Sequence, residues 1–170
     1  MSDNVYLGNP NLKKANTPIE FTEEQIIEFV QCQRDPVYFA NKYVKIVSLD
    51  EGLVPFTPYR FQEKLINNFH ENRFNICKMP RQTGKSTTVV SYLLHYAIFN
   101  DSVNIGILAN KAATARELLG RLQTAYENLP KWMQQGIMVW NKGSLELENG
   151  SKILAASTSA SAVRGMSFNI

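Results

Sequence analysis

The sequence is poor in the features that mark secreted proteins, membrane proteins and metal-bound scaffolds. Two cysteines, Cys32 and Cys77, are too few for a disulfide scaffold or a cysteine-rich zinc site, and they fit a reducing compartment. No apolar run reaches the roughly 18 residues of a membrane-spanning helix, and the polar start Met1-Ser2-Asp3-Asn4 is unlike a signal peptide. We therefore expect a protein of the cytoplasm that is not secreted and has no membrane partner.

An excess of charge of one sign is also lacking. The 170 residues include 18 Lys or Arg and 15 Asp or Glu, which gives a formal net charge of +3. This mildly basic balance permits nucleic-acid binding without requiring it, because domains that bind DNA by charge alone are usually more basic. The length and a hydrophobic content of 44% suffice for one domain with a packed core and argue against wholesale disorder.

The first third of the chain is expected to hold a flexible arm over residues 1–20 and a helical region over residues 21–54. The arm is polar and shows no hydrophobic periodicity. Thr22 and Gln25 have the spacing of a capping box, which predicts a helix that begins there and ends near Arg34. The other elements expected in this region are a short helix after Pro36, a short strand over residues 44–47 and a loop over residues 49–58.

From residue 55 onward, the pattern predicts strands that alternate with helices. Thr57-Pro58 is a good N-cap with proline at the first helical position, and Asn149-Gly150 is a strong hairpin signal. The expected elements are helices over residues 57–71, 85–99 and 112–129, strands over residues 74–78 and 103–109, and short strands between residues 136 and 157 with turns at 141–143 and 148–150. This alternation predicts a parallel sheet built from right-handed βαβ units.

The segment from Met79 to Ser86 carries the clearest chemical signal. Its end, Gly84-Lys85-Ser86, matches the second half of the P-loop of nucleoside-triphosphatases. In such a loop, main-chain N–H groups surround phosphate oxygens, and the following helix directs the positive end of its dipole at the same anion. Gly84 would let the main chain approach the phosphates, Lys85 would reach the β- and γ-phosphates, and the Ser86 hydroxyl would bind Mg²⁺.

The loop departs from the full pattern, which has a glycine where this chain has Met79. The half-motif alone also occurs by chance, so its context matters. An apolar strand over residues 74–77 is expected before the loop and a helix after it, as in a nucleotide site. An ordinary helix N-terminus with a solvated lysine is the alternative interpretation. Cys77, on the expected buried strand, is interpreted as a core residue.

Four blocks in the same order resemble the large terminase subunits of tailed bacteriophages, in particular those of T4-like phages. Residues 80–86 resemble the family's variant P-loop, in which Arg-Gln-x-Gly-Lys-Ser/Thr replaces the glycine-rich start. Residues 105–111 are similar to the second conserved block, and residues 140–151 to the segment that follows it in T4-like phages. Residues 162–165 are similar to the stretch just before the Walker B strand. The resemblance covers roughly residues 55–170.

The resemblance implies the fold and the activity of a DNA-packaging motor. The implied fold is a P-loop NTPase of the RecA/ASCE-like type, with a three-layer α/β/α core, a mostly parallel sheet and a small helical region before it. ATP hydrolysis with Mg²⁺ would drive double-stranded DNA into a procapsid. The implied partners are double-stranded DNA, the portal protein, the small terminase subunit and further copies in a ring. The implied location is the host cytoplasm and, transiently, the procapsid.

The resemblance also implies roles for single residues. Arg81 would contact the γ-phosphate from inside the loop, and Arg164 matches an arginine that reaches the nucleotide of a neighbouring subunit. Phe61 and Gln62 resemble the family's adenine-recognition motif, with Tyr59 as the alternative aromatic. The alternatives are a solvated or DNA-facing side chain for Arg81, a contact within its own subunit or a surface position for Arg164, and an exposed helix position for Gln62. The residues expected to contact the nucleotide are Phe61, Gln62, Pro80, Arg81, Gln82, Thr83, Gly84, Lys85, Ser86 and Thr87, with Arg81, Lys85 and Arg164 as catalytic residues and Ser86 as the Mg²⁺ ligand.

An acidic Walker B pair is expected after a strand that begins at Phe168, and these carboxylates are not in the sequence. The resemblance thus implies that residues 55–170 are the first portion of an ATPase domain, with a C-terminal remainder as a partner. We expect this chain alone to bind ATP with little or no turnover, because an acid–base element is missing. Two other functions stay open: a superfamily 2 helicase or translocase lobe, and a non-catalytic nucleotide-binding or assembly fragment.

Overall fold

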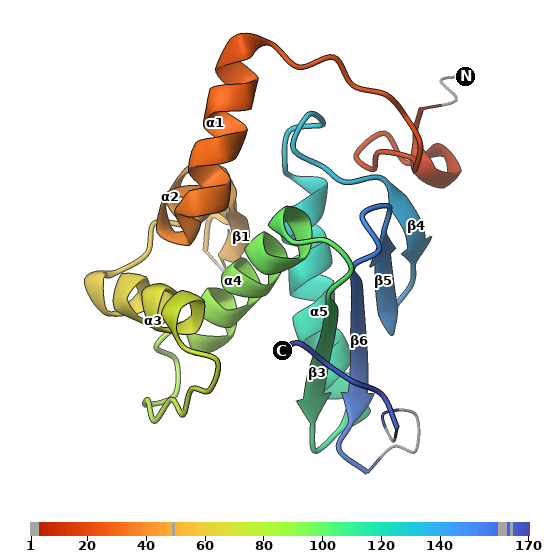
Figure 1. Ribbon diagram of the computed structural model, residues 1–170. Coiled ribbons are helices and arrows are strands. Elements are labelled where there is room, and N and C mark those ends of the chain that lie inside the picture. Colours follow the sequence, from red (N-terminus) through yellow and green to blue (C-terminus); the bar gives the residue numbers. More distant parts are fainter. Residues whose placement is uncertain (1–3, 49, 160–162, 164) are drawn as a thin grey trace.

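The chain folds into a group of helices, α1–α4, beside a sheet that helix α5 covers on one face (Figure 1). The structure is a computed structural model that describes residues 4–48, 50–159, 163 and 165–170. Among the helices of this described part, none is both long and apolar enough to cross a membrane.

The first two helices form as their start signals predict. Helix α1 spans Glu23–Arg34 and begins with the predicted capping box, in which the N–H of Gln25 donates to Thr22 Oγ1 at 3.2 Å. Helix α2, Pro36–Tyr43, has proline in its first turn. Strands β1, Lys45–Ser48, and β2, Gly52–Pro55, then pair as an antiparallel hairpin. Strand β2 lies where we expected a loop.

Residues 4–16, which belong to the expected flexible arm, pack against the sheet instead. They include a short 3-10 helix, Tyr6–Gly8, and the buried side chain of Leu12. The N–H of Ile137 donates to the carbonyl oxygen of Lys13 at 2.9 Å, and Lys13 Nζ lies 2.9 Å from Glu148 Oε1. The reason is that Ile137 belongs to an edge strand, whose free main-chain groups pair with any extended segment that reaches them.

Helix α3 spans Arg60–Glu71 and begins two residues later than the Thr57-Pro58 pair predicts. Its N-cap is Tyr59, whose N–H donates to the side chain of Gln62 at 2.8 Å. A glutamine at the third helical position thus satisfies a free main-chain donor at this helix end, and Thr57 belongs to the preceding loop.

The central elements follow the predicted order. Helix α4 spans Lys85–Phe99, as predicted, and strand β3 spans Asn104–Ala109. Helix α5, Ala112–Glu127, packs its buried residues Leu119, Leu122 and Tyr126 toward strands β3 and β6 and helix α4. The remaining strands are β4, Ile137–Trp140, β5, Ser144–Leu147, and β6, Lys152–Ser157, and the predicted Asn149-Gly150 turn joins β5 to β6.

The sheet is mixed, so the prediction of a mostly parallel sheet is wrong. Its strand order is β3-β6-β5-β4. Strands β3 and β6 are parallel, from Asn104 opposite Lys152 to Ala109 opposite Ser157, whereas the pairs β6–β5 and β5–β4 are antiparallel. The physical reason is that the short turns 141–143 and 148–151 join β4, β5 and β6 directly, whereas parallel neighbours need a crossover connection of about a dozen residues or more.

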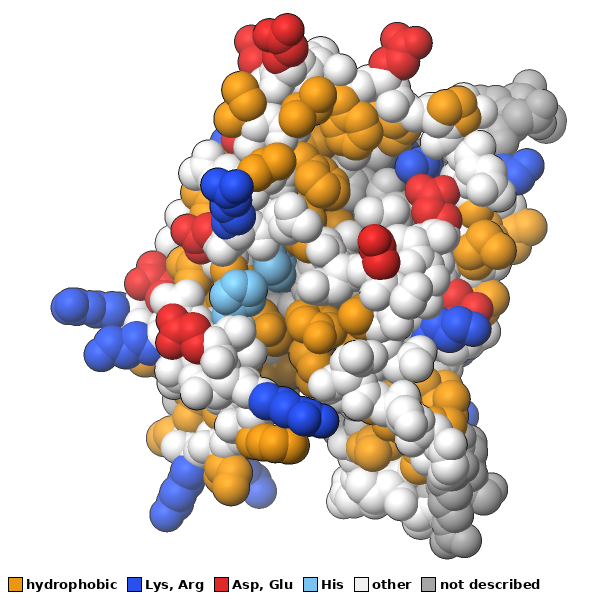
Figure 2. Space-filling view, in the orientation of Figure 1, with side chains coloured by type: hydrophobic (Ala, Val, Ile, Leu, Met, Phe, Trp, Pro, Cys, Tyr) orange, Lys and Arg blue, Asp and Glu red, His pale blue; other side chains and the backbone are white. Residues whose placement is uncertain are grey.

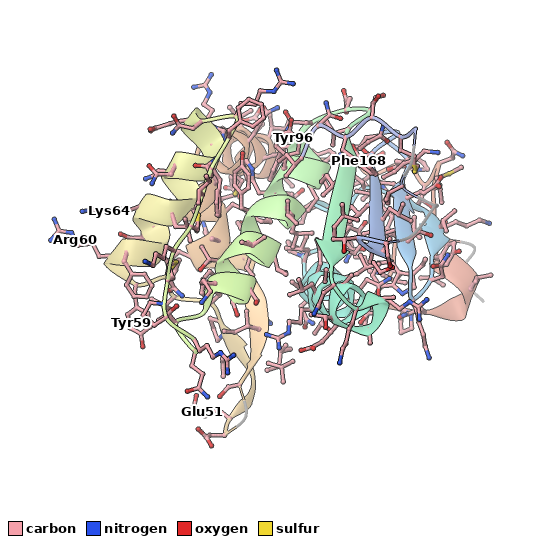
Figure 3. All side chains as sticks on the ribbon, turned by 90° about the horizontal axis from the view of Figure 1, so that it is seen from below. Glu51, Tyr59, Arg60, Lys64, Tyr96 and Phe168 are labelled. Atoms are coloured by element: carbon pink, nitrogen blue, oxygen red, sulfur yellow. The ribbon has the colours of Figure 1, made fainter. Side chains whose placement is uncertain are left out.

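The described residues 74–78 form no strand, which corrects a second prediction. The outer edge of β3 pairs instead with the last residues of the chain: Asn169 N–H donates to Asn104 O and Gly106 N–H donates to Ile170 O, both at 2.8 Å. The ring of Phe168 lies over Gly106 on the face of the sheet opposite α5 (Figure 3). Without a strand to pair with, residues 74–78 are exposed, including Cys77, which we had interpreted as a core residue.

Candidate functional site

The candidate phosphate loop, residues 79–84, forms a sharp turn into helix α4. Gly84 is the N-cap of α4 and has φ +73°, a left-handed conformation that costs residues with a side chain about 1–2 kcal/mol. The first hydrogen bond of the helix runs from Thr88 N–H to Gly84 O at 2.9 Å. The N–H groups of Lys85, Ser86 and Thr87 therefore have no acceptor within the helix and point toward the loop. This arrangement suits an anion.

The charges around the loop also suit an anion. Residues 72–100 contain four basic residues, Arg73, Lys78, Arg81 and Lys85, and no Asp or Glu. The first turn of α4 thus carries a lysine where acidic residues are usually favoured by the helix dipole. A cation at the positive end of a helix is unfavourable by itself, and a bound anion would remove that cost.

The Lys85 ammonium lies over its own loop. Lys85 Nζ donates to the carbonyl oxygen of Met79 at 3.1 Å and also to that of Pro80. The hydroxyl of Thr83 donates to the same Pro80 carbonyl at 3.0 Å. Gln82, between them, has φ +62°, which is uncommon for a residue with a side chain. These contacts fold the loop back so that its main chain and Lys85 face each other.

A cavity of about 540 Å³ lies beside the loop. At its rim, the rings of Tyr59 and Phe61 stack almost in parallel, with centroids 5.8 Å apart and planes 10° apart. Tyr59 is the N-cap residue at the start of α3 (Figure 3). An exposed aromatic stack of this kind offers a flat apolar surface on which a base can lie. The lining residues are Ile46, Pro55, Phe56, Thr57, Tyr59, Phe61, Gln62, Gln82, Thr83, Gly84 and Thr87.

Gln62 is buried between helix α3 and the loop, with 4% of its surface exposed. Its Oε1 accepts from Tyr59 N–H, and its Nε2 donates to Thr83 O at 3.3 Å. The alternative of an exposed helix position for Gln62 is therefore wrong. The side chain belongs to the site, although both of its polar atoms are engaged by the main chain.

The structure brings most of the expected nucleotide-contacting residues to one place. Tyr59, Phe61 and Gln62 line the cavity together with the loop residues Gln82, Thr83, Gly84 and Thr87. The other expected nucleotide-contacting residues of the loop, Pro80, Arg81, Lys85 and Ser86, are not among its lining residues, and the side chains of Arg81 and Ser86 are exposed. Arg164 lies outside the described residues.

Some residues of the site carry no signal in the sequence. The β1–β2 hairpin and the loop after it contribute Ile46, Pro55 and Phe56 to the cavity wall. Their sequence pattern indicates only a strand or a loop, and their position depends on the packing of the hairpin against α2 and α5.

The comparisons with known proteins bear on the family and on the fold. A family model described as "Terminase large subunit, T4likevirus-type, N-terminal" matches residues 76–170, more than half of the chain. The crystal structure of the HK97 bacteriophage large terminase is similar in fold, with a TM-score of 0.63 and 17% sequence identity. That similarity covers 79% of this chain and 29% of the HK97 protein, so the chain spans less than a third of that terminase. The chain belongs to the T4likevirus-type family of terminase large subunits and carries the N-terminal region of that family.

Proposed function

We propose that the phosphate loop binds ATP with Mg²⁺, and that the chain is the ATP-binding part of an ATPase that packages double-stranded DNA into phage procapsids. The observation that carries the proposal is the turn at Gly84, which leaves the N–H groups of Lys85, Ser86 and Thr87 without an acceptor in the helix, beside a lysine whose Nζ contacts the loop carbonyl of Met79. Backbone donors, a helix N-terminus and a lysine together are the usual binding elements for a triphosphate. Family membership supports the link to packaging and disfavours the helicase alternative.

The proposal gives each loop residue a task. Lys85 would exchange its main-chain carbonyl partners for the β- and γ-phosphates. The exposed hydroxyl of Ser86, in the first turn of α4, would bind Mg²⁺ together with phosphate oxygens, which are the ligands that Mg²⁺ prefers. Arg81, exposed on the loop, would offset the charge that develops on the γ-phosphate. Arg164 would reach the nucleotide bound by a neighbouring subunit.

We propose that this chain binds ATP without efficient hydrolysis. The residues described around the cavity include no Asp or Glu, and within the described ranges no cluster of His, Cys, Asp and Glu could hold a metal ion. Activation of the attacking water needs a general base, whose loss typically lowers the rate by about 10²–10⁴-fold. The same proposal includes the RecA/ASCE-like three-layer architecture. Its partners would be the C-terminal remainder, the portal protein, the small terminase subunit and further copies in a ring on the procapsid.

Thermal unfolding with and without Mg-ATP tests the proposal. At a ligand concentration about 100-fold above Kd, binding to the folded state adds about 2.7 kcal/mol of stability. For a chain of this size that raises Tm by roughly 5–11 °C. We expect this shift for the wild type and for Lys142→Ala, a control that removes an exposed lysine on the turn between β4 and β5, and a much smaller shift for Lys85→Ala. An equal shift in Lys85→Ala, or none in the folded wild type, contradicts the proposal.

A further inference from the structure

Helix α1 turns one face into the molecule and leaves the other face uncovered. On the inner face, the ring of Phe29 packs against that of Phe99, with centroids 4.9 Å apart, and Cys32 is completely buried. Glu28 lies on the same side, where its Oε1 is 2.8 Å from Lys42 Nζ. These contacts fix the rotation of α1 about its axis, and they therefore decide which of its side chains face outward.

The outer face of α1 carries an acidic, an apolar and a basic part in that order. Glu23 stands in the first turn, Ile27 and Val30 follow in the middle, and Arg34 stands in the last turn. Their spacing of four, three and four residues places all four side chains on one stripe of the helix. Ile27 is 68% exposed and Val30 is 37% exposed, and Ile26 beside them is also exposed. Figure 2 shows hydrophobic side chains over α1 and Asp or Glu side chains at the end where the helix begins.

The fold of a single copy leaves this stripe without a partner. In the part of the chain that the structure describes, neither Glu23 nor Arg34 takes part in an ion pair. The helix dipole accounts for the two charges, because it favours an acid at the start of a helix and a base at its end. It does not account for the two apolar side chains between them, which would gain from burial against another surface.

The stripe is complementary to itself, because the spacing of four, three and four residues is the same when it is read from either end. In an antiparallel pair of copies, Glu23 of each copy lies opposite Arg34 of the other, and Ile27 lies opposite Val30. A parallel pair would instead set Glu23 beside Glu23 and Arg34 beside Arg34, and like charges at a contact are unfavourable. The charges thus favour the antiparallel arrangement, in which both copies use the same surface and the contact closes as a two-fold dimer.

We propose that the outer face of α1 binds a second copy of this chain in an antiparallel, two-fold arrangement. The proposal does not rest on ATP binding by the phosphate loop. It also differs from the contact of a ring, in which two different surfaces of each copy meet. One face of a three-turn helix is small beside a standard interface, so the dimer is weak and forms at high protein concentration.

Sedimentation equilibrium from micromolar to millimolar concentration tests the proposal, at low salt, where charges are least screened. We expect a reversible dimer for the wild type. Glu23→Arg and Arg34→Glu should each weaken it on the order of tenfold or more, because each sets like charges opposite one another at both ends of the contact. The double variant exchanges the two signs and should restore the dimer. Lys64→Glu, a reversal of an exposed charge on α3, is the control and should leave the dimer unchanged.

The two single variants shift the net charge in opposite directions, so an equal loss in both cannot come from the net charge of the chain. A wild type that stays monomeric at every concentration overturns the proposal. So does a double variant that dimerises as weakly as the single variants.

Disulfide cross-linking tests the direction of the two helices. Ile27→Cys and Val30→Cys are made separately, each with Cys77→Ser to remove an exposed thiol, and the two proteins are then mixed and oxidised. The antiparallel pair sets position 27 opposite position 30, so the mixed disulfide should exceed the share expected from random pairing. A preference for disulfides between like positions, or cross-linking no faster than in Lys64→Cys, would overturn the arrangement.

Discussion

Replacement of Gly84 by alanine tests the conformation of the loop. Gly120→Ala is its matched control, because the same replacement there is expected to change the stability in the opposite direction. Gly84 has φ +73° and lies against Gln62, whereas Gly120 lies inside helix α5 and a Cβ built on it meets no atom within 4 Å. The same chemical change is thus made once where the backbone and the neighbours oppose it, and once where neither does.

The magnitudes follow from these contacts. Alanine in the left-handed region costs about 1–2 kcal/mol. Displacement of the Gln62 amide adds about 1 kcal/mol for each weakened hydrogen bond, to Tyr59 N–H and to Thr83 O. The sum for Gly84→Ala is about 3 kcal/mol, which lowers Tm by roughly 6–12 °C in a chain of this length. Gly120→Ala is expected to raise stability by about 1 kcal/mol, because alanine favours the helix interior.

Urea unfolding followed by tryptophan fluorescence measures both changes without any ligand, since Trp132 and Trp140 both lie in the folded chain. The reasoning is refuted if Gly84→Ala is as stable as the wild type, or if both variants shift stability in the same direction. Calorimetry of Mg-ATP binding to the same samples then shows whether the distorted loop also loses its ligand.

Two further predictions concern parts of the fold outside the loop. Burial lowers the pKa of His95 to about 4, more than its hydrogen bond to Cys32 O raises it, so the unfolded chain takes up a proton first as the pH falls below 6.5. Stability measured in urea should fall by about 2 kcal/mol from pH 7.5 to pH 5, and this fall should be absent in His95→Gln; an equal fall in both proteins contradicts the account. Burial raises the pKa of Glu148, but hydrogen bonds from Lys13 and from two backbone N–H groups outweigh this effect and lower the pKa overall. The carboxylate therefore stays charged and holds residues 4–16 against the sheet. Glu148→Ala should lower the free energy of unfolding by about 1–3 kcal/mol and expose residues 4–16 to proteolysis. Glu146→Ala, which breaks a more exposed ion pair, should do neither, and equal cleavage of the two variants would contradict this role of Glu148.

Local signals in the sequence account for the elements that were predicted well. The capping box at Thr22, the loop before Lys85 and the Asn149-Gly150 turn each specify structure through residues next to one another. Helix α4 and strand β3 also have strong apolar runs bounded by polar residues, so their limits were predicted to within a residue.

The elements that were missed depend on contacts between distant residues. Residues 74–78 have the composition of a strand, but a strand needs a neighbour, and the outer edge of β3 pairs with residues 169–170. Residues 4–16 are polar and aperiodic, yet they pair with the edge strand β4 and with Glu148. No pattern within residues 4–16 encodes these partners, because Ile137 and Glu148 lie more than 120 residues away, and no pattern within residues 74–78 shows that residues 169–170 pair with β3.

The candidate site shows the same division. The sequence predicts the loop and its lysine, since the order of residue types at Gly84-Lys85-Ser86 follows from phosphate chemistry. It also singles out Gln62, but not the fact that this side chain faces the main chain of Thr83. That contact depends on how α3 packs beside α4, which the spacing of residues does not specify.

Equilibrium titration of the chain with Mg-ATP, beside Lys85→Ala and the control Lys142→Ala, tests the central claim most directly. The account predicts saturable binding at one site in the wild type and in Lys142→Ala. Loss of the charge-assisted contacts of Lys85, worth about 1.5–3 kcal/mol, should weaken binding by roughly 10- to 100-fold. A folded wild type without saturable binding, or a Lys85→Ala variant that binds as tightly as the wild type, would contradict the assignment of the phosphate loop.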